Sequence, residues 1–202
     1  VAAAERVADF LARPIPKRSV GEPFAAGGAV SVRFDNVSAS YDGERLALDG
    51  VSFEIRSGEQ VAIVGENGAG KSTILSLIAG FLEPVAGTIL IDGRPLASLD
   101  LADVRRHIAF LPQRAFLFDA SIAENVAMDR PGDVAAALRA ARAEEFVGRL
   151  PHGADSRLGE GGAGLSGGEA QRLMLARAFF APAPLVLMDE PSNGLDIPSK
   201  SQ

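Results

Sequence analysis

The stretch GENGAGKS at residues 65–72 constrains this chain more than any other feature. It fits the pattern G-x-x-x-x-G-K-[S/T], in which a glycine-rich loop joins a strand to a helix. The glycines allow a tight turn that aims successive backbone N–H groups at phosphate oxygens, and the helix adds the positive end of its dipole. Lys71 would reach the β- and γ-phosphates, and the Ser72 hydroxyl would bind Mg²⁺. We predict a nucleotide site formed by Gly65, Glu66, Asn67, Gly68, Ala69, Gly70, Lys71, Ser72 and Thr73.

The sequence on either side of this loop has the character that the pattern requires. Residues 60–64 (QVAIV) form an apolar run typical of a buried strand, and residues 73–79 (TILSLIA) read as an apolar helix. The competing interpretation is a glycine-rich turn that carries a lysine by chance. The order strand, loop, helix favours phosphate binding.

Composition limits the class of protein. The chain has 202 residues, enough for one sizeable core with a subdomain. Its net charge of −6 argues against a nucleic-acid partner, which would need a basic face. The absence of cysteine excludes disulfides, thiol catalysis and thiolate metal sites. No apolar run approaches the roughly 18 residues that a membrane helix needs.

The rest of the chain divides into segments of distinct character. Residues 1–13 read as a helix and residues 14–29, rich in proline and glycine, as a linker, so that the domain begins near Val30. A helix is expected over residues 169–180, after a glycine-rich loop. The alanine-rich stretch 121–150 is helical in character and indicates an inserted helical subdomain. Apolar alternation and short apolar runs predict strands near residues 30–34, 51–55, 89–91, 108–111 and 185–188.

A second functional signal follows the last predicted strand. The apolar run 185–188 places Asp189 and Glu190 at its carboxyl end, where α/β sheets bind their ligands. Asp189 would hold Mg²⁺ through its water shell, and Glu190 would orient or deprotonate an attacking water. Alone, the pattern is better explained by a strand that ends in a solvated acidic turn. After a phosphate-binding loop, the catalytic interpretation is favoured.

The pentapeptide LSGGE at residues 165–169 indicates the family. Ser166 and Glu169 have the spacing of a capping box, and a capped helix start with two glycines exposes backbone N–H groups to a phosphate. Together with residues 65–72 and the following Gln171-Arg172, the pentapeptide resembles the signature of ATP-binding cassette (ABC) ATPases, over about residues 30–196. The resemblance implies an α/β P-loop NTPase core with a mostly parallel sheet, an N-terminal antiparallel β subdomain and an inserted helical subdomain at about 115–180.

In the ABC family, two nucleotide-binding domains pair head to tail, each ATP lying between the phosphate loop of one and the signature of the other. The resemblance therefore implies that the nucleotide of a second domain is contacted by Ser166, Gly167, Gly168 and Glu169. Asp196, in the stretch SNGLD at 192–196, would lie at the dimer interface.

Two further positions match family motifs. Gln113 matches the Q-loop glutamine, which touches Mg²⁺, and Tyr41 lies where the family stacks an aromatic ring on adenine. Their plainer interpretations are a polar turn residue and an aromatic residue at the end of a strand. With these positions, ATP and Mg²⁺ are the expected cofactors, the catalytic residues are Lys71, Gln113 and Glu190, and the metal ligands are Ser72, Gln113 and Asp189.

Two stretches resemble the exporter branch of the family: LFDASIAENV at 117–126 and GEGG at 159–162, where Glu160 would meet the membrane domain. Residues 1–13 would then be the tail of a preceding membrane-domain helix. The implied partners are a second nucleotide-binding domain and the transmembrane domain of the same transporter, at the cytoplasmic face of the bacterial inner membrane. The run 159–179 further resembles bacterial exporters of thiol reductants such as glutathione and cysteine.

Two other functions fit part of these signals. A soluble ABC ATPase acting on DNA or ribosomes would lack the exporter-like 159–162 stretch, and a nucleotide sensor without turnover would not need Glu190. The family's switch-loop histidine follows the D-loop, which the stretch 192–196 matches, and it is not reached before Gln202. We therefore expect a domain at 30–202 that is incomplete at its C-terminus and hydrolyses ATP weakly by itself.

Overall fold

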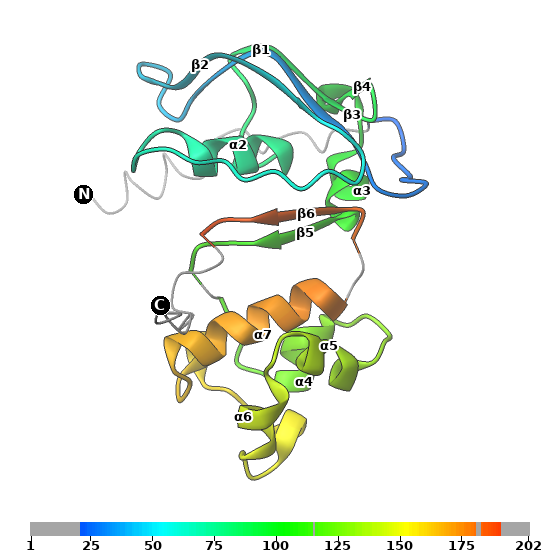
Figure 1. Cartoon of the computed structure of the whole chain (residues 1–202), viewed down its shortest axis with the longest axis vertical. Helices are drawn as coiled ribbons and strands as arrows, with labels where there is room; N and C mark the ends of the chain where they lie inside the picture. Colours follow the sequence, from blue (N-terminus) through cyan, green and yellow to red (C-terminus); the bar gives the residue numbers. More distant parts are fainter. Residues whose placement is uncertain (1–20, 115, 181–182, 191–202) are drawn as a thin grey trace, which may run out of the picture.

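The computed structural model describes residues 21–114, 116–180 and 183–190. Within them, one layer is a four-stranded antiparallel sheet of order β2-β1-β3-β4 (Figure 1). Side chains of β1 alternate as the sequence predicts, since Val32 and Phe34 are buried and Arg33 is exposed. Phe34 stacks on Phe53 across the pair, with ring centroids 4.5 Å apart. The predicted antiparallel N-terminal sheet is confirmed, with strands β1 (Val32–Ser40), β2 (Leu46–Ile55), β3 (Ala86–Ile91) and β4 (Arg94–Pro95).

Two helices lie beneath this sheet. The helix α2 (Lys71–Ile78) buries Leu77 and Ile78, as the apolar run after the glycine-rich loop predicts. The helix α3 (Leu101–Arg106) is capped by Asp100, whose carboxylate accepts from two backbone N–H groups of the first turn. The sheet, these helices and the 3₁₀ turn η1 (Leu96–Ser98) enclose the first hydrophobic core.

A parallel pair of strands, β5 (Ile108–Leu111) and β6 (Leu185–Met188), separates this core from a second one. Side chains of both strands alternate between the two cores. Phe110 and Leu187 contribute to the first core, whereas Leu111 and Met188 contribute to the second. Both predicted strands are therefore confirmed and lie between the two cores, although Val186 in β6 is 46% exposed.

Helices form the layer on the other side of β5 and β6 (Figure 1, lower half). The long helix α7 (Gly167–Phe180) packs against shorter ones to close the second core, which includes Leu138, Phe146 and Leu173. No helix in the described part of the chain is long and apolar enough to cross a membrane. The shorter elements of this layer are α4 (Ile122–Ala127), α5 (Val134–Ala140), α6 (Glu144–Gly148), η2 (Gly153–Asp155) and η3 (Glu160–Gly162).

One predicted element is wrong. Residues 60–64 form no strand in the structure, and Val61 and Val64 are 50% and 86% exposed. The segment faces β6 across a cavity, so it lacks the neighbouring strands that a buried strand requires. The expected mostly parallel sheet is thus reduced, among the described residues, to the pair β5–β6. An apolar run indicates that a segment favours burial, but it does not show whether a neighbouring strand is available for hydrogen bonding.

Several predictions lie outside the described residues. They are the helix at 1–13, the linker up to residue 20 and everything from residue 191, including Asp196.

Candidate active site

The glycine-rich loop at 65–70 is shaped by two glycines in the left-handed region. Gly68 has φ +84° and Gly70 has φ +89°. Gly70 caps the start of α2 and packs against β2, where a Cβ atom would lie 2.7 Å from the carbonyl oxygen of Ala47. Residues 65–69 are exposed. The loop therefore presents an open turn at the start of a helix, which is the geometry that binds phosphate groups.

Lys71 and its neighbours occupy the first turn of α2. The Lys71 Nζ donates to the carbonyl oxygens of Gly65 and Glu66 at 2.9 and 2.8 Å, so the ammonium lies against the loop itself. Thr73 is buried, and its hydroxyl accepts a hydrogen bond from the Tyr41 hydroxyl at 3.3 Å. The Tyr41 side chain is 66% exposed. The aromatic residue proposed for adenine thus lies beside the loop, with its ring accessible.

The acidic pair follows β6 directly. The Asp189 backbone N–H donates to the carbonyl oxygen of Leu111 at 2.9 Å and extends the pairing with β5 by one residue. Glu190 has φ +47°, a conformation that costs a non-glycine residue energy and that clusters at functional sites. The Gln113 Nε2 donates to Glu190 Oε2 at 2.7 Å. Two residues predicted to act together are therefore in direct contact.

The loop lysine and the acidic pair meet at one cavity of about 720 Å³. Lys71, Asp189 and Glu190 line it, and most of the remaining wall is apolar, with contributions from β1, β2, α2, α7, β6 and residues 61–63. The phosphate loop and the carboxyl end of β6 lie at the same edge of the molecule (Figure 1). The described residues include no cluster of three or more His, Asp or Glu side chains suited to a metal. The available oxygen donors, the Ser72 hydroxyl, the Gln113 amide and the Asp189 carboxylate, are of the type that Mg²⁺ prefers when phosphates complete its shell.

The signature stretch forms the start of α7. The Ser166 backbone N–H and hydroxyl both donate to the Glu169 carboxylate at 2.8 Å, and Ser166 Oγ accepts from the Glu169 N–H at 3.3 Å. The capping box is therefore present. The Ser166 backbone N–H, followed by its hydroxyl, lowers the pKa of Glu169. Ser166 and Gly167 are exposed, and the cavity wall described above does not include them. An exposed helix start away from the chain's own lysine is what a contact with a second subunit requires.

Two polar residues that the sequence did not single out join distant parts of the helical layer. Asn125 is buried at 1% exposure, and Arg177 donates to it from α7. They lie 52 residues apart in sequence. A buried asparagine and an arginine in an apolar helix are the local signals that could have drawn attention to them.

Known proteins are similar to this chain in sequence and in fold. A sequence model of the ABC transporter family matches residues 48–193. The chain is 47% identical over 174 residues to the mycobactin import ATP-binding/permease protein IrtB of Mycolicibacterium thermoresistibile. The aligned region covers 84% of this chain and 30% of that protein. It is 42% identical over 210 residues to the ATP-dependent lipid A-core flippase of Chromobacterium violaceum, which covers 99% of the chain and 35% of that protein.

A solved structure, that of a bacterial Atm1-family ABC exporter with ATP bound, superimposes with a TM-score of 0.85 at 38% identity. The match covers 96% of this chain and 35% of that one. The chain thus spans about a third of the length of these relatives, judged by coverage of 30% and 35%. Sequence identity at this level, the family match and the shared fold agree, and the chain belongs to the ABC transporter family.

Proposed function

We propose that this chain binds MgATP at the edge of the cavity, between the loop at 65–72 and the end of β6. We further propose that it drives a membrane transporter by hydrolysing the bond between the β- and γ-phosphates. The observation that carries the proposal is the meeting of Lys71, Asp189 and Glu190 at one cavity, with Gln113 bonded to Glu190. These four side chains come from the ends of three elements, where a ligand can reach them.

The residues take the following roles. The backbone N–H groups of residues 65–73 and the Lys71 ammonium hold the β- and γ-phosphates, and Tyr41 stacks on adenine. Ser72, Gln113 and Asp189 hold Mg²⁺, directly or through water, and this ion neutralises phosphate charge when bound. Glu190 accepts a proton from water or orients that water for in-line attack. Glu190 has a left-handed backbone conformation at the end of β6, and its carboxylate accepts a hydrogen bond from Gln113.

The exposed start of α7 serves a second copy of the domain. Ser166, Gly167, Gly168 and Glu169 would face the nucleotide bound by that copy. Backbone N–H groups at a helix start suit an anion, which supports this assignment. The further partner is the transmembrane domain of the same transporter, contacted in part by Glu160, at the cytoplasmic face of the bacterial inner membrane.

The direction of transport and the substrate rest on other parts of the protein. The relatives named above are described as an importer of mycobactin, a lipid A-core flippase and an exporter. Similar domains therefore serve different cargoes, as expected when substrate choice lies in the membrane domain. An exporter of thiol reductants stays a prediction from the run 159–179.

Two substitutions in the full-length polypeptide test the site. Lys71→Ala removes a charge-assisted contact with phosphate and should weaken MgATP binding about 10- to 100-fold. Glu190→Gln keeps the shape of the side chain and should leave MgATP affinity near the parent value, while phosphate release falls by about 10²–10⁴. Titration calorimetry measures the first effect and steady-state phosphate release the second. Unchanged affinity in Lys71→Ala would exclude the nucleotide site, and parental turnover in Glu190→Gln would place the catalytic carboxylate elsewhere.

A further inference from the structure

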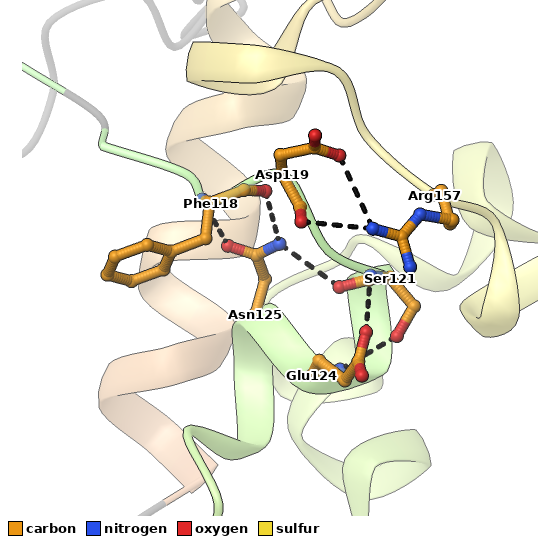
Figure 2. A network of polar contacts seen from close by, with 6 residues as sticks. All are labelled: Phe118, Asp119, Ser121, Glu124, Asn125 and Arg157. Atoms are coloured by element: carbon orange, nitrogen blue, oxygen red, sulfur yellow. Dashed lines mark hydrogen bonds and ion pairs between the residues drawn. The ribbon is translucent and has the colours of Figure 1, made fainter.

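A buried side chain, Asn125, makes three hydrogen bonds to the backbone of the loop between β5 and α4. Asn125 points from α4 into the loop, where its Nδ2 donates to the carbonyl oxygens of Phe118 and Ser121, each at 3.0 Å. Its Oδ1 accepts from the Phe118 N–H at 2.8 Å (Figure 2). With 1% exposure, the amide has replaced water as the partner of these backbone groups. The amide therefore supports the loop from the α4 side, while Ser121 at its end forms a single antiparallel bridge with Arg157.

Arg177 fixes the same loop to α7. Its Nε donates to the carbonyl oxygen of Asn125 at 2.8 Å, its Nη1 to that of Phe116 at 3.1 Å, and its Nη2 to Asn125 Oδ1 at 3.1 Å. The guanidinium also lies 5.6 Å from the centre of the Phe118 ring. Partial burial lowers the pKa of Arg177, and a cation withdrawn from water is stable only when its donors are paired in this way. The planar fork of arginine can satisfy these acceptors together, and a lysine cannot.

A second arginine contacts the loop from the other side and differs in burial. Arg157 donates to the carbonyl oxygen of Asp119 at 3.2 Å and lies 3.5 Å from its carboxylate (Figure 2). These two side chains are 69% and 67% exposed, so the ion pair contributes little. Backbone hydrogen bonds from Ile122 to Ser156 and from Leu158 to Ala120 hold this edge without the arginine side chain.

The position of this loop links the two halves of the proposed site. Its upstream end carries Gln113, which donates to Glu190. Arg177 belongs to α7, the helix that begins beside Ser166, the residue proposed to face the nucleotide of the second domain. A loop tied to α7 at Phe116 and Asn125 can therefore transmit a shift of that helix to the side chain that touches the catalytic carboxylate.

We propose that Arg177 and Asn125 are positioning residues that join the loop 116–121 and α7 into one rigid body, so that Gln113 and Ser166 are placed together for hydrolysis. The proposal rests on the proposed function, because it concerns the rate of ATP hydrolysis by the dimeric domain. Each domain contributes Gln113 to its own ATP site and Ser166 to the ATP site of its partner. The contact of Arg177 and Asn125 would keep these two residues in a fixed relative position.

The test uses the full-length polypeptide with the variants Arg177→Lys, Arg177→Ala and Arg157→Lys. Arg177→Lys should lower kcat for MgATP hydrolysis by about 10- to 100-fold, since small misplacements of catalytic groups have effects of this size. The affinity for MgADP, which is held mainly by the phosphate loop and Tyr41 and lacks the γ-phosphate that water attacks, should stay within about twofold of the parent. Arg157→Lys should match the parent in both measurements. Arg177→Ala should be at least as slow as Arg177→Lys, because it removes every donor of the fork.

A double substitution separates positioning from a structural role. If Arg177 acts through Gln113, then Gln113→Ala combined with Arg177→Lys should be no slower than the slower single variant. Multiplied losses, a parental kcat in Arg177→Lys, or loss of MgADP affinity or folded protein in that variant would each overturn the proposal. Failure of the proposed function would show differently, as a parent protein without MgATP turnover or a Lys71→Ala variant with unchanged MgATP affinity.

Discussion

Replacing Gly70 by alanine should lower the free energy of unfolding far more than the same change at Gly68, two residues earlier. Both glycines have nearly the same backbone conformation, φ +89° and +84°. A Cβ atom in this left-handed region costs about 1–2 kcal/mol at either position. The surroundings differ, because a Cβ on Gly68 would have no atom within 4 Å, whereas on Gly70 it would lie 2.6 Å from Leu48 Cδ2 and 2.7 Å from the Ala47 carbonyl oxygen.

The magnitude follows from that contrast. Gly68→Ala carries the conformational cost alone, so its free energy of unfolding should fall by about 1–2 kcal/mol. Gly70→Ala adds the cost of forcing a methyl group against the backbone of β2 and buried Leu48, typically about 1–3 kcal/mol, for a total of about 2–5 kcal/mol. The obstruction includes a main-chain oxygen, which cannot rotate away as the end of a side chain can.

Urea unfolding of both variants, followed by far-ultraviolet circular dichroism, measures the difference. With an m-value of about 2 kcal/mol per molar urea, the midpoint of Gly70→Ala should lie about 0.5–1.5 M below that of Gly68→Ala. Equal midpoints at equal m-values would show that the contact of the loop with β2 contributes nothing, and the packing argument would fail.

Two further predictions concern single side chains. Tyr41→Ala should weaken ATP binding about 5- to 150-fold, because stacking of a base on an aromatic ring contributes about 1–3 kcal/mol. The affinity for tripolyphosphate, which has no base, should not change, and an equal loss for both ligands in calorimetry would refute adenine stacking. Glu169→Gln should reduce the free energy of unfolding at pH 7 and make it less dependent on pH. The folded state lowers the pKa of Glu169, so the ionised carboxylate stabilises the fold at pH values above its ordinary pKa of 4.5. This contribution is lost as the pH falls through the pKa of the folded state. Urea midpoints measured from pH 7 to pH 3 test this, with Glu145→Gln, an exposed carboxylate on α6, as the control; parallel curves for Glu169→Gln and the parent would contradict it.

The features predicted correctly from the sequence depend on neighbours along the chain. The capping box at Ser166 and Glu169 needs a spacing of three residues, and the burial of Val32 and Phe34 needs alternation within one strand. The left-handed turn at Gly70 similarly follows from a local pattern. Each of these arrangements is specified by the side chains and backbone preferences of one short segment.

The features that the sequence did not predict depend on contacts between distant segments. Asn125 and Arg177 meet through helix packing across 52 residues, with no spacing rule to indicate it. The run at 60–64 has the composition of a buried strand, but strand formation requires a partner at hydrogen-bonding distance, and the cavity separates it from β6. The site roles assigned by resemblance stay predictions, and Asp196 lies outside the described residues.

The contact between Gln113 and Glu190 follows from strand register. Leu111 pairs with Met188 at the ends of β5 and β6, and each of the two polar residues stands two positions beyond its strand's last residue. Parallel pairing in this register brings equal offsets to the same level, and a slip of one residue would send one side chain to the opposite face. The register is set by burial, because Phe110 and Leu187 must face the first core while Leu111 and Met188 face the second. The apolar pattern of two short strands therefore places the Glu190 carboxylate, the proposed catalytic group, beside the Gln113 amide.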